Sequence, residues 1–175
     1  MDDRGLMERV ARRDEAAFGE LVERYGGRLL AVARRLLGSR ADAEDAVQRA
    51  LMQCYLGAGG YQPRWALSTW LYRIVANACV DELRRRGVRA AHAGPGDTES
   101  EGSVGPPDAG RRIDVGRAMA RVPREARVLL TLHYVDGLSN GELARIRGIS
   151  VNTVKSQLAR GKAILRRALD EGGRA

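Results

Sequence analysis

Residues 139–169 decide the fold of the C-terminal part, and they read SNGELARIRGISVNTVKSQLARGKAILRRAL. Ser139 and Glu142 have the spacing of a capping box, in which two side chains satisfy free backbone amides at the start of a helix. Gly148 supplies a turn, and Ser150 suits the N-cap of a second helix. Two helices joined by a short glycine-containing turn are typical of a helix-turn-helix module.

The second of these helices has an apolar stripe and a polar face. At about 100° per residue, Val151, Val154, Leu158 and Leu165 share the stripe. Amide and hydroxyl groups at the front of such a helix suit the edges of bases, and long basic side chains suit phosphates. A solvated helix face is the plain alternative, but the capping, the turn and the charge favour DNA. The residues expected to contact DNA are Asn152, Thr153, Lys155, Ser156, Gln157, Arg160, Arg166 and Arg167.

Two further helices are expected just upstream of this module. Residues 113–122 predict a short helix, and Pro123 suits the first turn of the next one. That next helix is expected to end near Gly137. Its predicted buried residues are Ala126, Leu129, Leu130 and Tyr134.

Helical periodicity also organises residues 18–86. A first helix ends at Gly38, and Ser39 with Asp42 resembles a capping box for a second, which ends at Gly57. The predicted buried face of the second helix is Ala43, Val47, Ala50, Leu51 and Cys54. The segment GAGGYQPR (57–64) breaks the pattern before a third helix, which begins near Leu67 and continues to the basic run at residues 84–86. No period-two pattern predicts a strand, so the fold class is all-α.

Residues 87–112 are rich in Gly, Pro, Ser and acidic residues and have no hydrophobic period. This composition is typical of a flexible linker. The sequence therefore predicts two small helical domains, 1–86 and 113–175, joined by that linker.

Charge and hydropathy limit the classes of partner and compartment. The formal net charge is +8, and residues 114–175 carry 12 basic against 6 acidic side chains. Such a surplus in a folded part favours a polyanionic partner. No apolar run approaches the roughly 20 residues of a spanning helix, and the first residues lack the apolar region of a signal peptide. We therefore expect a cytoplasmic protein without membrane insertion.

Motifs for catalysis and metal binding are absent from the sequence. Cys54 and Cys79 fall at apolar helical positions and are interpreted as core residues, and with His92 and His133 they lack the spacing of a zinc finger. A nuclease would need clustered carboxylates with supporting groups, which do not accompany the acids near residue 42. We expect no catalytic residue, no metal, no cofactor and no enzymatic activity.

Two groups of polar and aromatic residues are candidates for binding. Asp42, Glu44 and Asp45 either complement a helix dipole or receive a basic partner. Near Arg64, the aromatic rings of Tyr61 and Trp65 could stack on unpaired bases, whereas core packing explains Trp70.

Three stretches carry a family resemblance. DEAAFGELVERYGGRLLAVARRLLGSRADAEDAVQRALMQCY (14–55) and STWLYRIVANACVDELRRR (68–86) resemble region 2 of the sigma-70 factors. VPREARVLLTLHYVDGLSNGELARIRGISVNTVKSQLARGKAILRRAL (122–169) resembles region 4. With nothing like regions 1 or 3, the chain is similar to the extracytoplasmic-function (ECF) class.

The resemblance implies a role in transcription initiation with core RNA polymerase and promoter DNA as partners, and an anti-sigma factor as regulator. It implies polymerase binding by Asp42, Glu44, Asp45 and Gln48. The loop from Gly60 to Leu67 would capture a flipped base of the −10 element, and the helix after it would face that element. The residues implied there are Tyr61, Arg64, Trp65, Asn77, Asp81, Arg84 and Arg85, and the final helix would recognise the −35 element.

Three positions depart from the family pattern. Arg49 stands where an acid is usual, Gln157 replaces a common Arg, and Gly141 replaces a common Glu. Residues 124–155 also resemble the LuxR-type helix-turn-helix of response regulators, which is the alternative interpretation. The N-terminal part argues against it, because a receiver domain alternates strands and helices.

Overall fold

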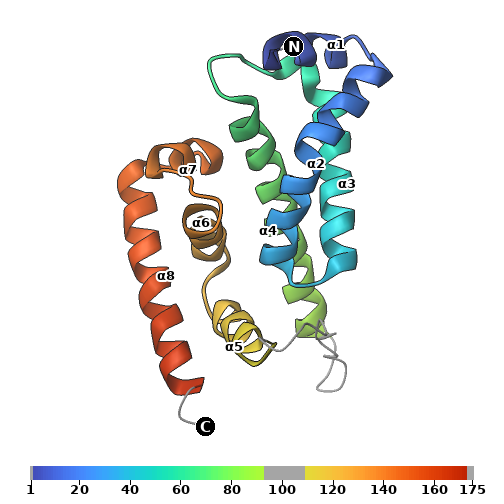
Figure 1. Cartoon of the computed structure of the whole chain (residues 1–175). Helices are drawn as coiled ribbons and strands as arrows, with labels where there is room; N and C mark the ends of the chain where they lie inside the picture. The colour runs from blue at the N-terminus through green and yellow to red at the C-terminus, as the bar shows by residue number, and fades with distance from the viewer. Residues whose placement is uncertain (1, 93–108, 173–175) are drawn as a thin grey trace. The chain divides into compact units, whose positions relative to one another are not determined.

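The computed structural model describes residues 2–92 and 109–172. Within these ranges the regular structure is helical and no strand occurs, which confirms the all-α prediction. The elements in chain order are α1 (Asp3–Ala11), α2 (Glu15–Leu37), α3 (Arg40–Gly57), the 3-10 turn η1 (Ala58–Gly60), α4 (Leu67–His92), α5 (Ala109–Ala120), α6 (Arg124–Tyr134), α7 (Asn140–Arg147) and α8 (Val151–Gly172) (Figure 1). The chain divides into two compact units, the first mainly within Met1–Glu82 and the second mainly within Leu83–Ala144 and Gly148–Ala175.

Helices α2 and α3 form the centre of the first unit; both end where the sequence predicts, α3 also begins at its predicted cap, and α2 begins at Glu15, before the first apolar residue of the predicted pattern. Gly38 ends α2 with a φ of 71°, a left-handed conformation that glycine adopts without strain. The Ser39 hydroxyl then accepts a hydrogen bond from the Asp42 amide and caps α3. The two helices lie side by side and bury small and branched side chains between them. The buried residues are Leu21, Leu29, Val32, Ala33, Leu36, Ala43, Ala46, Val47, Ala50 and Cys54.

Helix α1 was not predicted, because its stretch of sequence is dominated by charge. Its apolar residues Leu6, Met7 and Val10 are at most 1% exposed, and it packs against α2, α3 and η1. Asp2 caps its first turn by accepting a hydrogen bond from the Gly5 amide. A three-residue apolar stripe is too short to be distinguished from chance by periodicity alone.

Helices extend into both ends of the linker that the composition predicts at residues 87–112. Helix α4 continues to His92, and α5 begins at Ala109, so both enter the range 87–112. Residues 84–92 hold arginine and alanine, which favour a helix, and the single Gly87 costs only about 1 kcal/mol in a helix interior. The middle of the predicted linker, 93–108, lies outside the described residues.

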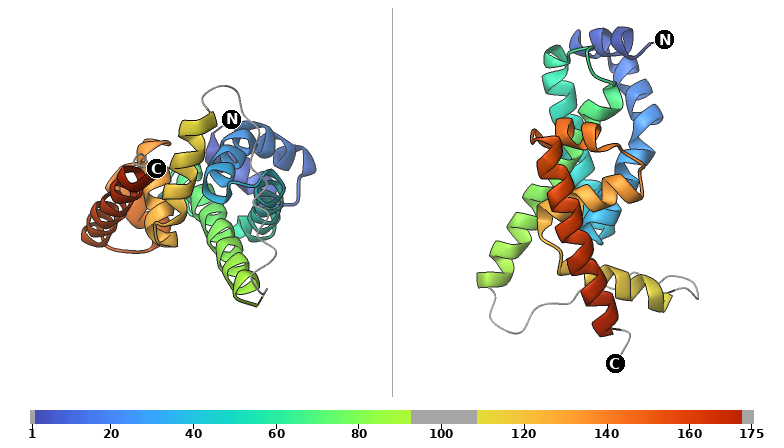
Figure 2. Two further views of the ribbon diagram at one scale, coloured as in Figure 1. Left: turned by 90° about the horizontal axis from the view of Figure 1, so that it is seen from below. Right: turned by 90° about the vertical axis from the view of Figure 1, so that its left-hand side faces the viewer.

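In the second unit, α8 packs along α6 and also contacts α5, as Figures 1 and 2 both show. Gly161 permits the close approach, because a Cβ at this position would lie 3.0 Å from Ala126 Cβ and from Leu130 Cδ1. The unit buries Val122, Ala126, Val128, Leu129, Leu130, Leu132, Leu143, Val154 and Leu158.

Two predicted core residues of this unit are exposed, so those predictions were wrong. Tyr134 is 60% exposed because it is the last residue of α6, and its ring lies beneath the Lys162 ammonium at 5.8 Å. Val151 is 41% exposed because it is the first residue of α8 and has no preceding helical turn to cover it.

Candidate nucleic-acid and protein interfaces

The acidic candidates lie on α3, and the helix brings three of the four polar residues to one side. At about 100° per residue, Glu44, Asp45 and Gln48 point away from the buried alanine face, and all three are exposed. Asp42 lies in the first turn, on the flank of that face, and is half-buried. Asp42 thus has both the dipole-compensating position and a place beside the acidic face.

Two apolar side chains that sequence reasoning missed extend this face toward the end of α3. Met52 is 57% exposed and Leu56 is 63% exposed. They follow Gln48 at intervals of four residues, so they share its side of the helix. Their four-residue spacing could have identified them, but apolar residues at helical spacing are normally interpreted as core residues. We call Glu44, Asp45, Gln48, Met52 and Leu56 the α3 outer face.

Arg49, which departs from the family pattern, connects α3 to α4. Its Nη2 donates to Glu82 Oε2 at 3.0 Å, and its Nη1 lies 3.1 Å from Asp45 Oδ2. Glu82 is only 5% exposed, and a hydrogen-bonded cation offsets part of the cost of burying a carboxylate. Arg49 therefore has an internal structural role in this chain.

The loop before α4 holds the aromatic candidates, and its residues have different surroundings. Arg64 is exposed, and its guanidinium lies 5.7 Å from the centre of the half-buried Trp65 ring. The hydroxyl of Tyr61 donates to the Trp65 carbonyl at 2.9 Å, and the Tyr61 ring meets Trp70 edge-on at 5.6 Å. The loop thus leaves Arg64 and Trp65 available for binding, whereas the Tyr61 side chain makes contacts within the loop and with α4.

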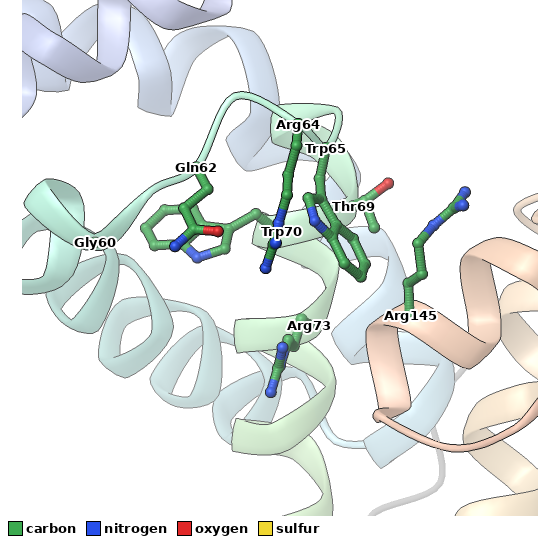
Figure 3. A pocket seen from close by; sticks show the side chains of 8 residues that line it. All are labelled: Gly60, Gln62, Arg64, Trp65, Thr69, Trp70, Arg73 and Arg145. Atoms are coloured by element: carbon green, nitrogen blue, oxygen red, sulfur yellow. The ribbon is translucent and has the colours of Figure 1, made fainter.

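The candidates on α4 continue from this loop along an exposed side of the helix. Asn77, Asp81 and Arg84 share one side, and Arg85 lies on its flank; all four are exposed. Arg73, four residues before Asn77, is exposed on the same side and was missed by sequence reasoning. Figure 3 shows Arg73 on α4 below the side chains of Gln62, Arg64 and Trp65.

The helix-turn-helix geometry of the second unit matches the sequence prediction closely. The capping box at α7 is complete, because the Ser139 hydroxyl accepts from the Glu142 amide and Glu142 Oε2 accepts from the Ser139 amide at 2.8 Å. Gly148 has a φ of 66° at the turn, and the Ser150 hydroxyl accepts from the Thr153 amide at 3.0 Å. These contacts fix the direction in which α8 leaves the turn.

The polar residues of α8 differ in how free their side chains are. Asn152, Lys155, Ser156, Arg160, Arg166 and Arg167 are exposed, and Thr153 and Gln157 are half-buried. The Thr153 hydroxyl pairs with that of Ser150 at 2.8 Å, and the Ser156 hydroxyl donates to the Thr153 carbonyl at 3.0 Å. At the front of the helix, Asn152 and Lys155 are thus exposed, whereas the hydroxyls of Thr153 and Ser156 are already hydrogen-bonded within the unit.

Both cysteines are buried, as predicted, and burial raises each thiol pKa to about 12. Nearby charges act on Cys79 more weakly, with Arg49 lowering and Glu82 raising its pKa. His133 is half-buried, and its Nδ1 lies 2.7 Å from the Leu138 carbonyl. In the part of the chain that the structure describes, no three His, Cys, Asp or Glu side chains are placed to hold a metal ion, and no helix has the length and apolar character of a membrane span.

Comparison with known proteins identifies both units. Residues 21–89 match Sigma-70 region 2, and residues 112–165 match Sigma-70, region 4. The ECF RNA polymerase sigma factor SigM of Mycobacterium tuberculosis is 36% identical over 156 residues, which cover 89% of this chain and 79% of the relative. The RNA polymerase sigma-H factor of Pseudomonas aeruginosa is 31% identical, over 95% of this chain and 93% of the relative.

A solved structure has the same fold over nearly the whole chain. The structure of CnrH in complex with the cytosolic domain of CnrY has a TM-score of 0.71 and 26% sequence identity, covering 97% of both chains. The response-regulator alternative is not favoured, because the N-terminal part matches region 2 and contains no strand among its described residues. The chain belongs to the ECF RNA polymerase sigma factors of the sigma-70 family.

Proposed function

We propose that this sigma factor docks on core RNA polymerase through the α3 outer face and recognises a promoter through α4, the loop before it, and α8. The observation that carries this assignment is the separation of chemistry between exposed faces. The α3 outer face is acidic and apolar, whereas Arg64, Arg73 and Arg84 line the loop and α4. A surface of the first kind repels nucleic acid and suits a basic or apolar protein partner, and the second kind attracts phosphates.

For the −10 element, we assign single-stranded DNA to the loop and α4. Aromatic rings beside arginine side chains bind unpaired bases by stacking and by cation–π contact. Trp65 and Arg64 provide that pair, and Asn77, Arg84 and Arg85 would follow the strand along α4. We assign −35 recognition to the front of α8, with Arg160, Arg166 and Arg167 near phosphates.

The family pattern divides these tasks between a domain at 1–86 and a domain at 113–175, and we propose the intervening segment as their connection. The protein acts by binding, without catalysis of its own, in the cytoplasm where polymerase and promoter DNA are found. The CnrH structure contains the cytosolic domain of a second protein, CnrY. By analogy, we propose that an anti-sigma factor binds this chain and regulates it.

The decisive experiment is multi-round transcription from genomic fragments with purified core polymerase, with and without the protein. We expect new, defined transcripts only when the protein is present, and weak binding to duplex DNA by the protein alone. A protein that binds duplex operators tightly, without any effect on core polymerase, would contradict the proposal.

The docking assignment is tested by Asp45→Lys combined with Gln48→Ala. Both residues are exposed, and the variant replaces the i,i+4 pair of Asp45 with Arg49 by a like-charge pair, so stability should fall by only about 0.5–1 kcal/mol while affinity for core polymerase falls. Glu23→Lys, the same charge reversal at an exposed position of α2, is the matched control and should bind core normally. Unchanged affinity of the double variant would remove the α3 outer face from the interface.

The −35 assignment is tested by two variants of α8. Gln157→Ala should relax the preference at one or two promoter positions, by about 1–3 kcal/mol if Gln157 makes a bidentate base contact. Replacing Arg166 and Arg167 should weaken all promoters alike and reduce the log–log salt slope by about 0.9 per lost phosphate contact. A selection of −35 sequences at two salt concentrations separates the two effects, and an exchange of these outcomes would mean that the helix is rotated in the groove.

A further inference from the structure

Tyr61 is held inside the loop that precedes α4 by two contacts. Its Oη donates to the Trp65 carbonyl oxygen at 2.9 Å, which ties the Tyr61 side chain to the backbone four residues later. Its ring meets the Trp70 ring edge-on, with centroids 5.6 Å apart and planes at 62°. Trp70 lies on the first turn of α4, so these contacts join the loop to the helix that follows it.

The residues enclosed by this hydrogen bond face outward. Gln62, Pro63 and Arg64 are exposed, and Trp65 is half-buried. The Trp65 amide donates to the Gln62 carbonyl at 3.4 Å, so residues 62–65 form a turn. The side chains of Gln62, Arg64 and Trp65 are directed to one side of the loop in Figure 3. Their directions depend on the backbone that the Tyr61 hydroxyl closes.

Helix α1 supports the start of the same loop. It packs against η1, whose Ala58 is 3% exposed, and Ala58 O accepts the Tyr61 amide at 3.1 Å. Burial raises the pKa of the Tyr61 phenol, and the negative charges of Asp3 and Asp2 raise it further. The phenol is therefore protonated at neutral pH and available as a donor.

We propose that Tyr61 is a positioning residue, whose hydroxyl closes the loop and thereby sets the orientation of Gln62, Arg64 and Trp65 toward the −10 strand. The inference rests on the proposed function of this loop. It assigns Tyr61 a different role from the base-stacking role that its aromatic ring beside Arg64 suggested from the sequence. A stacking role requires only the ring, whereas a positioning role through Trp65 O requires the hydroxyl.

Tyr61→Phe separates these roles, because it removes the hydroxyl and keeps the ring. The control is Tyr55→Phe, the same chemical change on α3 of the same unit. Hydrogen exchange of the full chain is the first measurement. The Trp65 amide, which donates to the Gln62 carbonyl, reports opening of the 62–65 turn. We expect it to exchange about threefold to tenfold faster in Tyr61→Phe, because losing the bond from Tyr61 Oη to the Trp65 carbonyl favours that opening. An unchanged exchange rate would overturn the closing role of the hydroxyl.

The second measurement uses holoenzyme assembled with core polymerase and single-stranded non-template −10 DNA. The sequence of this DNA is taken from the promoters that the wild-type protein uses in the transcription experiment, and each base is replaced in turn. We expect Tyr61→Phe to lose about threefold to tenfold of its discrimination among these strands, with Tyr55→Phe unchanged. Unchanged discrimination in Tyr61→Phe, with loss only in Tyr61→Leu, would show that the ring itself contacts DNA and would overturn the proposal. A wild-type holoenzyme without any preference among the strands would instead refute the proposed function of the loop, and the exchange measurement distinguishes that case.

Discussion

Arg49→Met tests the connection between α3 and α4 directly. The substitution keeps an unbranched side chain of similar length and removes the guanidinium. It eliminates the 3.0 Å contact with the buried Glu82 carboxylate and the 3.1 Å contact with Asp45. The first contact should dominate, because Glu82 is 5% exposed, whereas the Asp45 side chain is 59% exposed and screened by water.

The expected loss follows from this geometry. A hydrogen bond to a charged group contributes about 1.5–3 kcal/mol, and an exposed pair at i,i+4 adds about 0.3–0.5 kcal/mol. The Arg49 side chain is itself 33% exposed, so we take the lower part of the first range and expect about 2 kcal/mol. In a unit of this size, that free energy corresponds to a decrease in Tm of roughly 8–16 °C.

Tryptophan fluorescence measures this loss in the full chain, because the only two tryptophans, Trp65 and Trp70, both lie in the first unit. Urea unfolding followed at these tryptophans gives the free energy of unfolding of that unit. Arg40→Met is the matched control on the same helix. The Arg40 side chain is 76% exposed and pairs only with Glu44 in the contacts described, so its replacement should cost less than about 0.5 kcal/mol. Equal losses in the two variants would refute the internal role of Arg49.

The same geometry determines what an acid at position 49 would do. Arg49→Glu restores the residue type usual in the family, but it places a third carboxylate beside Asp45 and Glu82 in this chain. Like charges at these distances repel, so the variant should be less stable than Arg49→Met. Arg49 therefore belongs with the packing of the unit.

Three further outcomes are expected. Burial raises the thiol pKa values of Cys54 and Cys79 to about 12, so between about pH 9 and 12 only the unfolded chain loses these protons. The free energy of unfolding should therefore fall over this pH range, and it should fall less in a variant with alanine at both positions. An equal fall in that variant would contradict the prediction. Gly161→Leu should destabilise the second unit by about 1–3 kcal/mol in denaturation followed by circular dichroism, because even a Cβ would lie only 3.0 Å from Ala126 Cβ and Leu130 Cδ1, and a leucine side chain extends further. An unchanged transition would show that α6 and α8 can separate freely. In selections of −35 sequences, Asn152→Ala should change the preferred bases and Ser156→Ala should not, because the Ser156 hydroxyl already donates to a backbone carbonyl; the reverse result would show that this bond breaks on binding DNA.

The sequence predicted the helices of the two units well wherever start and stop signals accompanied the apolar period. Gly38, Ser39, Gly148 and Ser150 all stand at the helix ends that the structure shows. Where the signals were weak, the prediction failed. Helix α1 has too few apolar residues to be distinguished from a charged segment, and α4 runs past Arg86 because composition alone does not end a helix.

Exposure at helix ends was the second kind of failure. A period of 3.6 residues assigns a side chain to a face but assumes that another element covers that face along its whole length. Tyr134 and Val151 stand at the last and first positions of their helices, where this assumption fails. Met52 and Leu56 show the same limit, because they are apolar and lie at helical spacing but are exposed.

The roles of polar site residues depend on atoms that a sequence pattern does not locate. Tyr61, Arg49 and Thr153 have the residue types expected of a surface that binds nucleic acid or protein, but each has a polar group bonded to a neighbour within its own unit. Such a group can contact a ligand only if its internal bond is broken, at a cost that an uncommitted group avoids. Specific recognition should therefore fall on exposed residues such as Arg64 and Asn152, while the internally bonded residues determine where those side chains point.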